Sequence, residues 1–148
     1  MTPVSLVLDL VERVWNGGDL DALPEYFADP FEHDGSTSTV ASLVEWHRDD
    51  AATWAGTAYV VLDCVATGDA VALRWRATST HVGPWGPVPT TGRRVEWMGA
   101  HFFRVARARI VAMDALADRF GKAMQLVVLL TPPEPPPDEG RQQGDDAD

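Results

Sequence analysis

Three consecutive segments between Gly68 and Asp118 alternate apolar and polar residues, and this alternation constrains the fold more than any other feature of the chain. A period of two residues is typical of a β-strand with one buried face. The apolar face of the first strand carries Val71, Leu73, Trp75, Ala77, Ser79 and His81. That of the second carries Val95, Trp97, Gly99, His101, Phe103 and Val105. The third is the short run from Ile110 to Met113. The pattern predicts three neighbouring strands with two imidazoles on their buried face.

Polar side chains on this apolar face indicate a cavity. A buried polar group either has a partner or lines a pocket. His81 and His101 interrupt the face, and the carboxylates Asp114 and Asp118 follow the third strand. We therefore expect a deep pocket that contains acid and base groups and has substrate-binding aromatic walls made by Tyr59, Trp75, Trp97 and Phe103.

The residues on either side of these strands predict helices. Apolar residues recur at helical spacing up to Trp15, and Asn16-Gly17-Gly18 supplies the left-handed residues that end a helix. A second helix begins at Asp19 or Pro24, a third spans 42–54 and ends at Gly56, and a strand covers 57–65. The last helix runs from Asp114 or later through Gln125. Helices followed by an antiparallel meander predict an α+β fold.

Composition predicts a single domain over residues 1–130 with a tail. The chain has 148 residues, of which 45% are hydrophobic, and this is enough for one core. Residues 131–148 are acidic and proline-rich, so we expect them to be disordered. The net charge of −10 argues against binding to nucleic acid or an anionic membrane. A single cysteine, no signal peptide and no membrane-spanning run predict a cytoplasmic protein.

The sequence lacks the common motifs of cofactor and metal sites. It has no Walker loop, dinucleotide fingerprint or nucleophile elbow, and its four histidines show no ligand spacing. We therefore expect no cofactor and no metal. Lys122 is the only lysine, which excludes Schiff-base chemistry at every other position.

Several short motifs, taken in order, resemble the SnoaL-like polyketide cyclases of the nuclear transport factor 2 like superfamily. They are Gly68-Asp69-x-Val71-Ala72, Thr80-His81-x-Gly83, 89–93, Phe103-Arg104-Val105, Ile110-Val111 and Asp118, and the likeness extends over residues 4–127. The resemblance implies a cone of curved antiparallel sheet closed by about three helices, a homodimer, no cofactor, and an acid/base role for Asp118. The family commonly has Glu, His and Trp where this chain has Ala112, Met113 and Asp114.

The expected chemistry is ring closure by acid/base catalysis. A base must remove a proton from carbon, and an acid must protonate the new alkoxide. A carboxylate in an apolar cone has a raised pKa and can do both, so Asp118 is the candidate. His101 or His81 would orient a carbonyl or act as the second acid/base. Three structural interpretations remain open. Asp118 could be an exposed helix carboxylate, Asp114 could be an N-cap, and the two histidines could be core residues hydrogen-bonded to backbone carbonyls.

Two further groups of residues are interpreted as structural. We expect Glu32-His33-Asp34 to form a solvated turn, and Trp15, Trp46 and Trp54 to pack helices.

The sequence thus predicts a polyketide cyclase that acts on a hydrophobic, polyketide-like small molecule. Two alternatives remain open. The same pocket could perform epoxide opening, a pericyclic step, hydration or isomerisation, because fold does not fix function. The domain could also bind a hydrophobic ligand, or dimerise, without catalysis. Asp114 in place of tryptophan favours a reaction other than the family's usual aldol closure.

Overall fold

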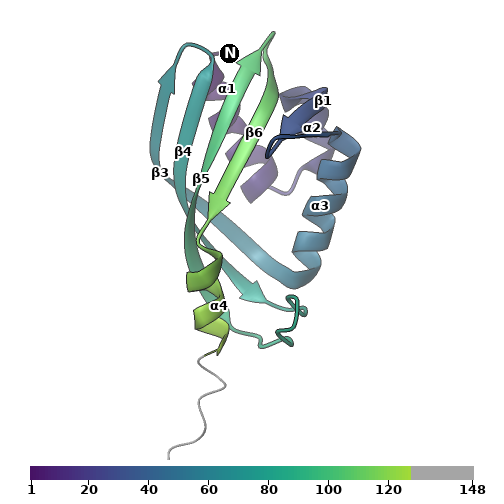
Figure 1. Cartoon of the computed structure of the whole chain (residues 1–148), viewed down its shortest axis with the longest axis vertical. Helices are drawn as coiled ribbons and strands as arrows, with labels where there is room; N and C mark the ends of the chain where they lie inside the picture. The colour runs from purple at the N-terminus through teal and green to yellow at the C-terminus, as the bar shows by residue number, and fades with distance from the viewer. Residues whose placement is uncertain (128–148) are drawn as a thin grey trace, which may run out of the picture.

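The computed structural model describes residues 1–127, which form one curved sheet with helices on one side (Figure 1). The helical elements are α1 (Pro3–Leu10), a π-helical segment (Val11–Asn16), a 3-10 turn (Leu20–Ala22), α2 (Leu23–Tyr26), α3 (Val40–Thr53) and α4 (Arg119–Val127). The strands are β1 (Phe27–His33), β2 (Ser36–Ser38), β3 (Trp54–Thr67), β4 (Ala70–His81), β5 (Arg94–Ala106) and β6 (Arg109–Ala117). The predicted α+β class is confirmed.

The sheet has the strand order β2-β1-β6-β5-β4-β3. Strands β3 to β6 form the predicted antiparallel meander, in which Leu73 pairs with His101 and Ala77 with Trp97. Strand β1 adds a parallel pairing with β6 that local sequence does not predict. The register places Trp75, Trp97 and His101 on one face of the sheet, because directly paired residues point the same way.

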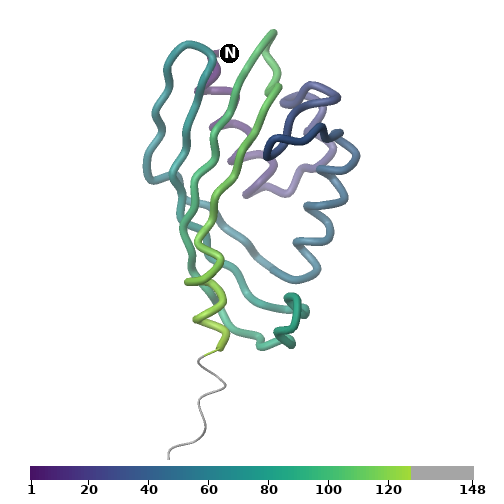
Figure 2. The backbone as a smooth tube through the Cα atoms, viewed as in Figure 1, coloured from purple at the N-terminus to yellow at the C-terminus, as the bar shows by residue number. Residues whose placement is uncertain are grey.

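Helices α1, α2 and α3 lie on the concave side of the sheet, and the loop between β4 and β5 closes one end of the cone (Figure 2). Apolar residues from the helices and strands share one buried cluster there, including Leu10, Leu23, Leu73, Phe103 and Ile110. Burial of this cluster supplies the main driving force for folding. The opposite face of the sheet carries no helix among the described residues.

The first helix ends where the sequence predicts. Gly18 has a positive φ of 74°, and a Cβ on Gly17 would lie 2.4 Å from the Arg13 carbonyl oxygen. Asn16, at the end of the π-helical segment, forms two hydrogen bonds with the backbone of the edge strand β3. Its Nδ2 donates to the Tyr59 carbonyl oxygen (3.0 Å), and its Oδ1 accepts from the Tyr59 N–H (2.7 Å). These two bonds fix the position of Tyr59.

Two boundaries differ from the predictions. Gly56 does not end α3; β3 begins directly at Trp54, and Gly56, with φ of 63°, lies where the β3–β4 register shifts. The last helix, predicted to begin at Asp114 or later, begins at Arg119. The last strand is longer than the predicted run from Ile110 to Met113, because β6 continues to Ala117 through pairing with β5. These ladder hydrogen bonds outweigh the local helix propensity of Ala115, Leu116 and Ala117.

Two further predictions concern the tail and membrane-spanning segments. The predicted tail, 131–148, lies outside the described residues. Within residues 1–127, no helix has the length and apolar character needed to cross a membrane.

Candidate functional site

A cavity of about 320 Å³ lies between the concave face of the sheet, α3 and α4. All six tryptophans of the chain line it: Trp15, Trp46, Trp54, Trp75, Trp85 and Trp97. The predicted wall residues Trp75, Trp97 and Tyr59 are among the lining residues. Trp15, Trp46 and Trp54, which the sequence predicts to pack helices, also line the cavity. Such walls suit a flat, largely apolar ligand.

His101 lines the cavity from β5 as a neutral imidazole. Burial lowers the pKa of His101 to about 4, so the ring is uncharged at pH 7. Its Nδ1 accepts a hydrogen bond from the Trp75 indole N–H at 2.8 Å, and the ring stacks on Phe103 at 5.8 Å. Because an accepting Nδ1 carries no hydrogen, the proton must be on Nε2. His101 therefore has one N–H donor left for a ligand.

Helix α3 contributes His47 and Asp50 to the wall facing the sheet. Burial lowers the pKa of His47 to about 4. Burial raises the pKa of Asp50, and the positive charge of Lys122 opposes that rise. The pKa of Tyr59 is also raised, mainly by burial and then by the Asp50 charge, so its hydroxyl stays protonated. The cavity thus holds a carboxylate beside uncharged hydrogen-bond donors.

The turn between β1 and β2 brings His33 and Asp34 to the cavity. Asp34 and Gly35 both have positive φ, as a tight hairpin turn requires. The Asp34 Oδ1 accepts from the Ala115 N–H at 2.8 Å, and the His33 Nε2 lies 3.6 Å from the Asp34 Oδ2. The predicted turn is present, but its side chains reach the cavity wall instead of only facing solvent.

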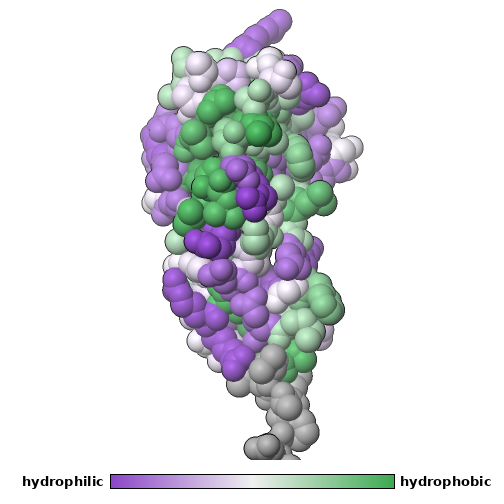
Figure 3. All heavy atoms as spheres, turned by 90° about the vertical axis from the view of Figure 1, so that its left-hand side faces the viewer, coloured by the Kyte–Doolittle hydropathy of each residue, from purple (hydrophilic) through white to green (hydrophobic). Residues whose placement is uncertain are grey.

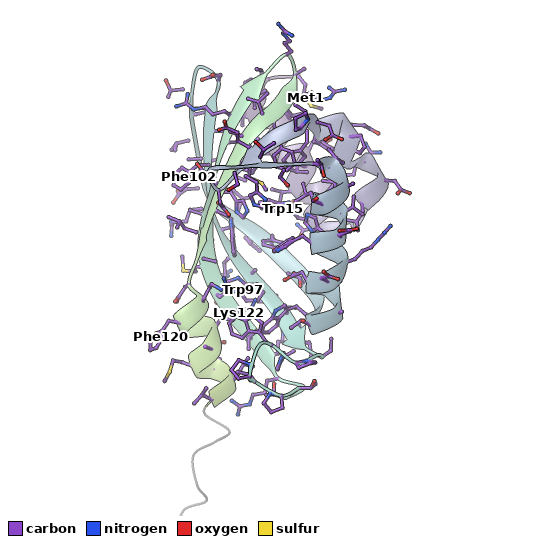
Figure 4. All side chains as sticks on the ribbon, turned by 45° about the vertical axis from the view of Figure 1, so that its right-hand side comes forward. Met1, Trp15, Trp97, Phe102, Phe120 and Lys122 are labelled. Atoms are coloured by element: carbon purple, nitrogen blue, oxygen red, sulfur yellow. The ribbon has the colours of Figure 1, made fainter. Side chains whose placement is uncertain are left out.

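Lys122 projects from the first turn of α4 into the same cavity, near Trp97 (Figure 4). Its Nζ lies 3.7 Å from the ring centroid of Trp54, 3.8 Å from that of Trp97 and 5.4 Å from that of Trp85. The residue is only 8% exposed. Burial lowers the pKa of Lys122 to about 8, against the opposing effect of Asp50. Aromatic faces at these distances attract a cation.

Comparison with known proteins identifies the family. A sequence profile of the SnoaL-like polyketide cyclases matches residues 5–126. The chain belongs to the SnoaL-like polyketide cyclase family. No match is found among curated protein sequences.

Solved structures agree with this family. IdmH from Streptomyces antibioticus, assigned as a polyketide cyclase, is 28% identical, with a TM-score of 0.77 over 85% of this chain and 99% of IdmH. A SnoaL-like polyketide cyclase from Agrobacterium tumefaciens shares the fold at 21% identity and a TM-score of 0.77, over 85% of this chain and 98% of that one. AclR from Streptomyces galilaeus, assigned as a hydroxylase, shares the fold at 24% identity and a TM-score of 0.74, over 84% of this chain and 94% of AclR.

Asp118, implied by the resemblance, and Asp114, where the chain departs from the family, both lie outside the lining of this cavity. Asp118 is exposed, and its Oδ1 accepts from the Gly121 N–H at 2.8 Å, so it caps α4. Asp114 is exposed in mid strand, paired with Phe102, and is neither an N-cap nor a wall residue. The reason is strand periodicity, because Met113, Ala115 and Ala117 point inward and their neighbours outward.

His81 and Phe103 are core residues of this SnoaL-like domain and do not line the cavity. His81 is fully buried, and its Nδ1 lies 2.9 Å from the Thr91 hydroxyl and 3.2 Å from the Thr91 N–H. These bonds anchor the loop between β4 and β5. Phe103 lies against the His101 ring and supports it. Of the four predicted acid/base residues, only His101 therefore lines the cavity.

Several lining residues were missed from the sequence. The charged and titratable ones are His33, Asp34, His47, Asp50, Arg119 and Lys122. Helical spacing could have revealed the two on α3, because Leu43, His47 and Asp50 follow one another at i, i+4 and i+7 and so share a face. The two on the hairpin carry no such signal, since their position depends on the parallel pairing of β1 with β6.

Proposed function

We propose that this protein is a polyketide cyclase that closes a ring within a polyketide-derived intermediate by acid/base catalysis, without a cofactor. The observation that carries the proposal is that a candidate base and a candidate hydrogen-bond donor line the same cavity from facing walls. The Asp50 carboxylate, with its raised pKa, lies on α3, and the His101 N–H donor lies on the facing sheet. Family membership supports the substrate class.

In the proposed mechanism Asp50 is the base and His101 the electrophilic donor. The Asp50 carboxylate removes a proton from the carbon between two carbonyl groups, and the His101 Nε2–H bonds the carbonyl oxygen that gains negative charge. The enolate carbon then attacks the carbon of another carbonyl group in the same substrate molecule. The protonated Asp50 then returns its proton to the new alkoxide, so the product is an isomer of the substrate.

A pericyclic closure in the same cavity is a second candidate. Position 113, where the family commonly has histidine, holds the buried, inward-facing Met113. With Met113, Ala115 and Ala117, the inner face of β6 offers no titratable group at these positions. A pericyclic step needs no proton transfer, so the tryptophan walls alone would guide it.

The test is turnover of a synthetic linear poly-β-ketone thioester, followed by chromatography and mass spectrometry. We expect a cyclised isomer from the parent, and a loss of kcat of about a hundredfold or more in Asp50→Asn and in His101→Leu, which removes the N–H donor. Asp49→Asn, an exposed neighbour on the same helix, is the matched control and keeps full turnover. Unchanged kcat in both cavity variants would reject acid/base catalysis and favour the pericyclic route.

We further propose that the protein is a cytoplasmic homodimer in antibiotic biosynthesis. Support for the dimer comes from the convex face of the sheet, where apolar side chains gather within a hydrophilic border (Figure 3). Met98, Phe102 and Leu116 belong to this face and are 41%, 46% and 69% exposed. A second copy of the chain would cover these side chains.

A further inference from the structure

We infer that Lys122 forms an anion-binding subsite, and that the substrate carries a carboxylate or an enolised 1,3-dicarbonyl whose negative oxygen binds the Lys122 ammonium. This inference names the substrate class of the proposed cyclase and rests on its cavity. It does not depend on which residue moves the proton.

The first argument is the charge of a nearly buried side chain. Lys122 is 8% exposed, and the carboxylates of residues 1–127 all lie beyond ion-pair distance of its Nζ. A buried charge without a counter-ion costs free energy. Asp50 acts on this charge only from beyond ion-pair distance, so the Lys122 ammonium is left for a ligand to pair with directly.

The second argument is the geometry of the cage. Trp54 and Trp97 hold the ammonium between their faces at 3.7 and 3.8 Å, so its position is fixed before a ligand arrives. Aromatic faces attract the cation but do not neutralise its charge, and an ammonium has three N–H donors. The cage thus preorganises a charged donor in the cavity wall.

The third argument is the distribution of charge along the cavity. Arg119, one turn away on α4, also lines the cavity, and its charge lies near enough to lower the Lys122 pKa. The α4 end is therefore positive, while Asp50 and Asp34 bring negative charge from α3 and the hairpin. An anionic group at the α4 end would direct the rest of a linear substrate towards Asp50 and His101.

The experiment uses two aromatic probes of equal size, 2-naphthoate and its neutral analogue 2-naphthamide. Because all six tryptophans line the cavity, quenching of tryptophan fluorescence measures both dissociation constants. We expect the parent to bind naphthoate about tenfold more tightly than naphthamide, as one charged hydrogen bond provides. Lys122→Met should abolish this preference and leave the naphthamide affinity unchanged, which also shows that the cavity is intact.

Arg48→Met is the matched control, because it removes one positive charge at an exposed position of α3 outside the cavity lining. It should keep most of the preference. Equal affinities in the parent, or a preference that survives in Lys122→Met, would overturn the inference. Loss of the preference only in Arg48→Met would do the same. Binding is measured without turnover, so a failed cyclisation assay leaves this result standing.

Discussion

At the scale of single residues, the burial of His101 makes the stability of the fold depend on pH. An unfolded histidine has a pKa of about 6.5. Burial lowers the pKa of His101 in the folded state to about 4. Below the unfolded pKa, the unfolded chain binds a proton that the folded chain does not, so stability decreases as the pH falls from about 6.5 to about 4. The buried neutral ring therefore costs no stability above about pH 6.5, where the unfolded histidine is also neutral.

We predict that His101→Gln flattens this pH dependence, because the amide oxygen can still accept the Trp75 N–H but cannot be protonated. The parent should lose up to about 3 kcal/mol more than the variant between pH 6.5 and 4. His47 has the same sign and remains in both proteins, so it cancels. Melting temperatures across this range measure the effect. Parallel curves for the two proteins would show that His101 does not titrate as described.

At the scale of elements, Asp118 caps α4, and we predict that this cap is its role. Because Asp118 satisfies the Gly121 N–H at the start of the helix, Asp118→Ala should cost about 1 kcal/mol of unfolding free energy and leave kcat unchanged. Asp114→Ala, which removes an exposed carboxylate without a cap, is the control and should be neutral. Urea midpoints and turnover are measured together. A large loss of kcat in stable Asp118→Ala would restore the catalytic role.

Local periodicity predicts correctly which residues share a face within a single strand. The alternation in β4 and β5 placed His101, Trp75 and Trp97 on the concave face, as the register confirms. It gave too short a last strand, because the length of β6 depends on pairing with β5 and not on the helix-forming residues at 115–117. It also missed Asp50, since a polar residue on a helix looks solvated until the opposing sheet is known. Contacts between distant elements decided these cases.

At the scale of the whole molecule, the exposed convex face of the sheet should be the dimer interface. We predict that the parent sediments at twice its chain mass of 16.2 kDa, and that Leu116→Glu sediments as a monomer, because the new charges would be desolvated in the interface. Val82→Glu, an equally apolar but separate exposed site in the loop after β4, should remain dimeric. A monomeric parent, or a dimeric Leu116→Glu, would place the interface elsewhere or remove it.

The single lysine has a consequence for covalent labelling. Amine-reactive reagents modify most proteins at many surface sites, but here arginine supplies the other basic side chains and does not react with active esters. Besides the chain's amino terminus, the one primary amine stands between Trp54 and Trp97, with a pKa of about 8 that leaves part of it nucleophilic near neutrality. Acylation of an amine-bearing side chain is thereby confined to the cavity. The fold offers a single internal handle for attaching an inhibitor or a synthetic catalytic group.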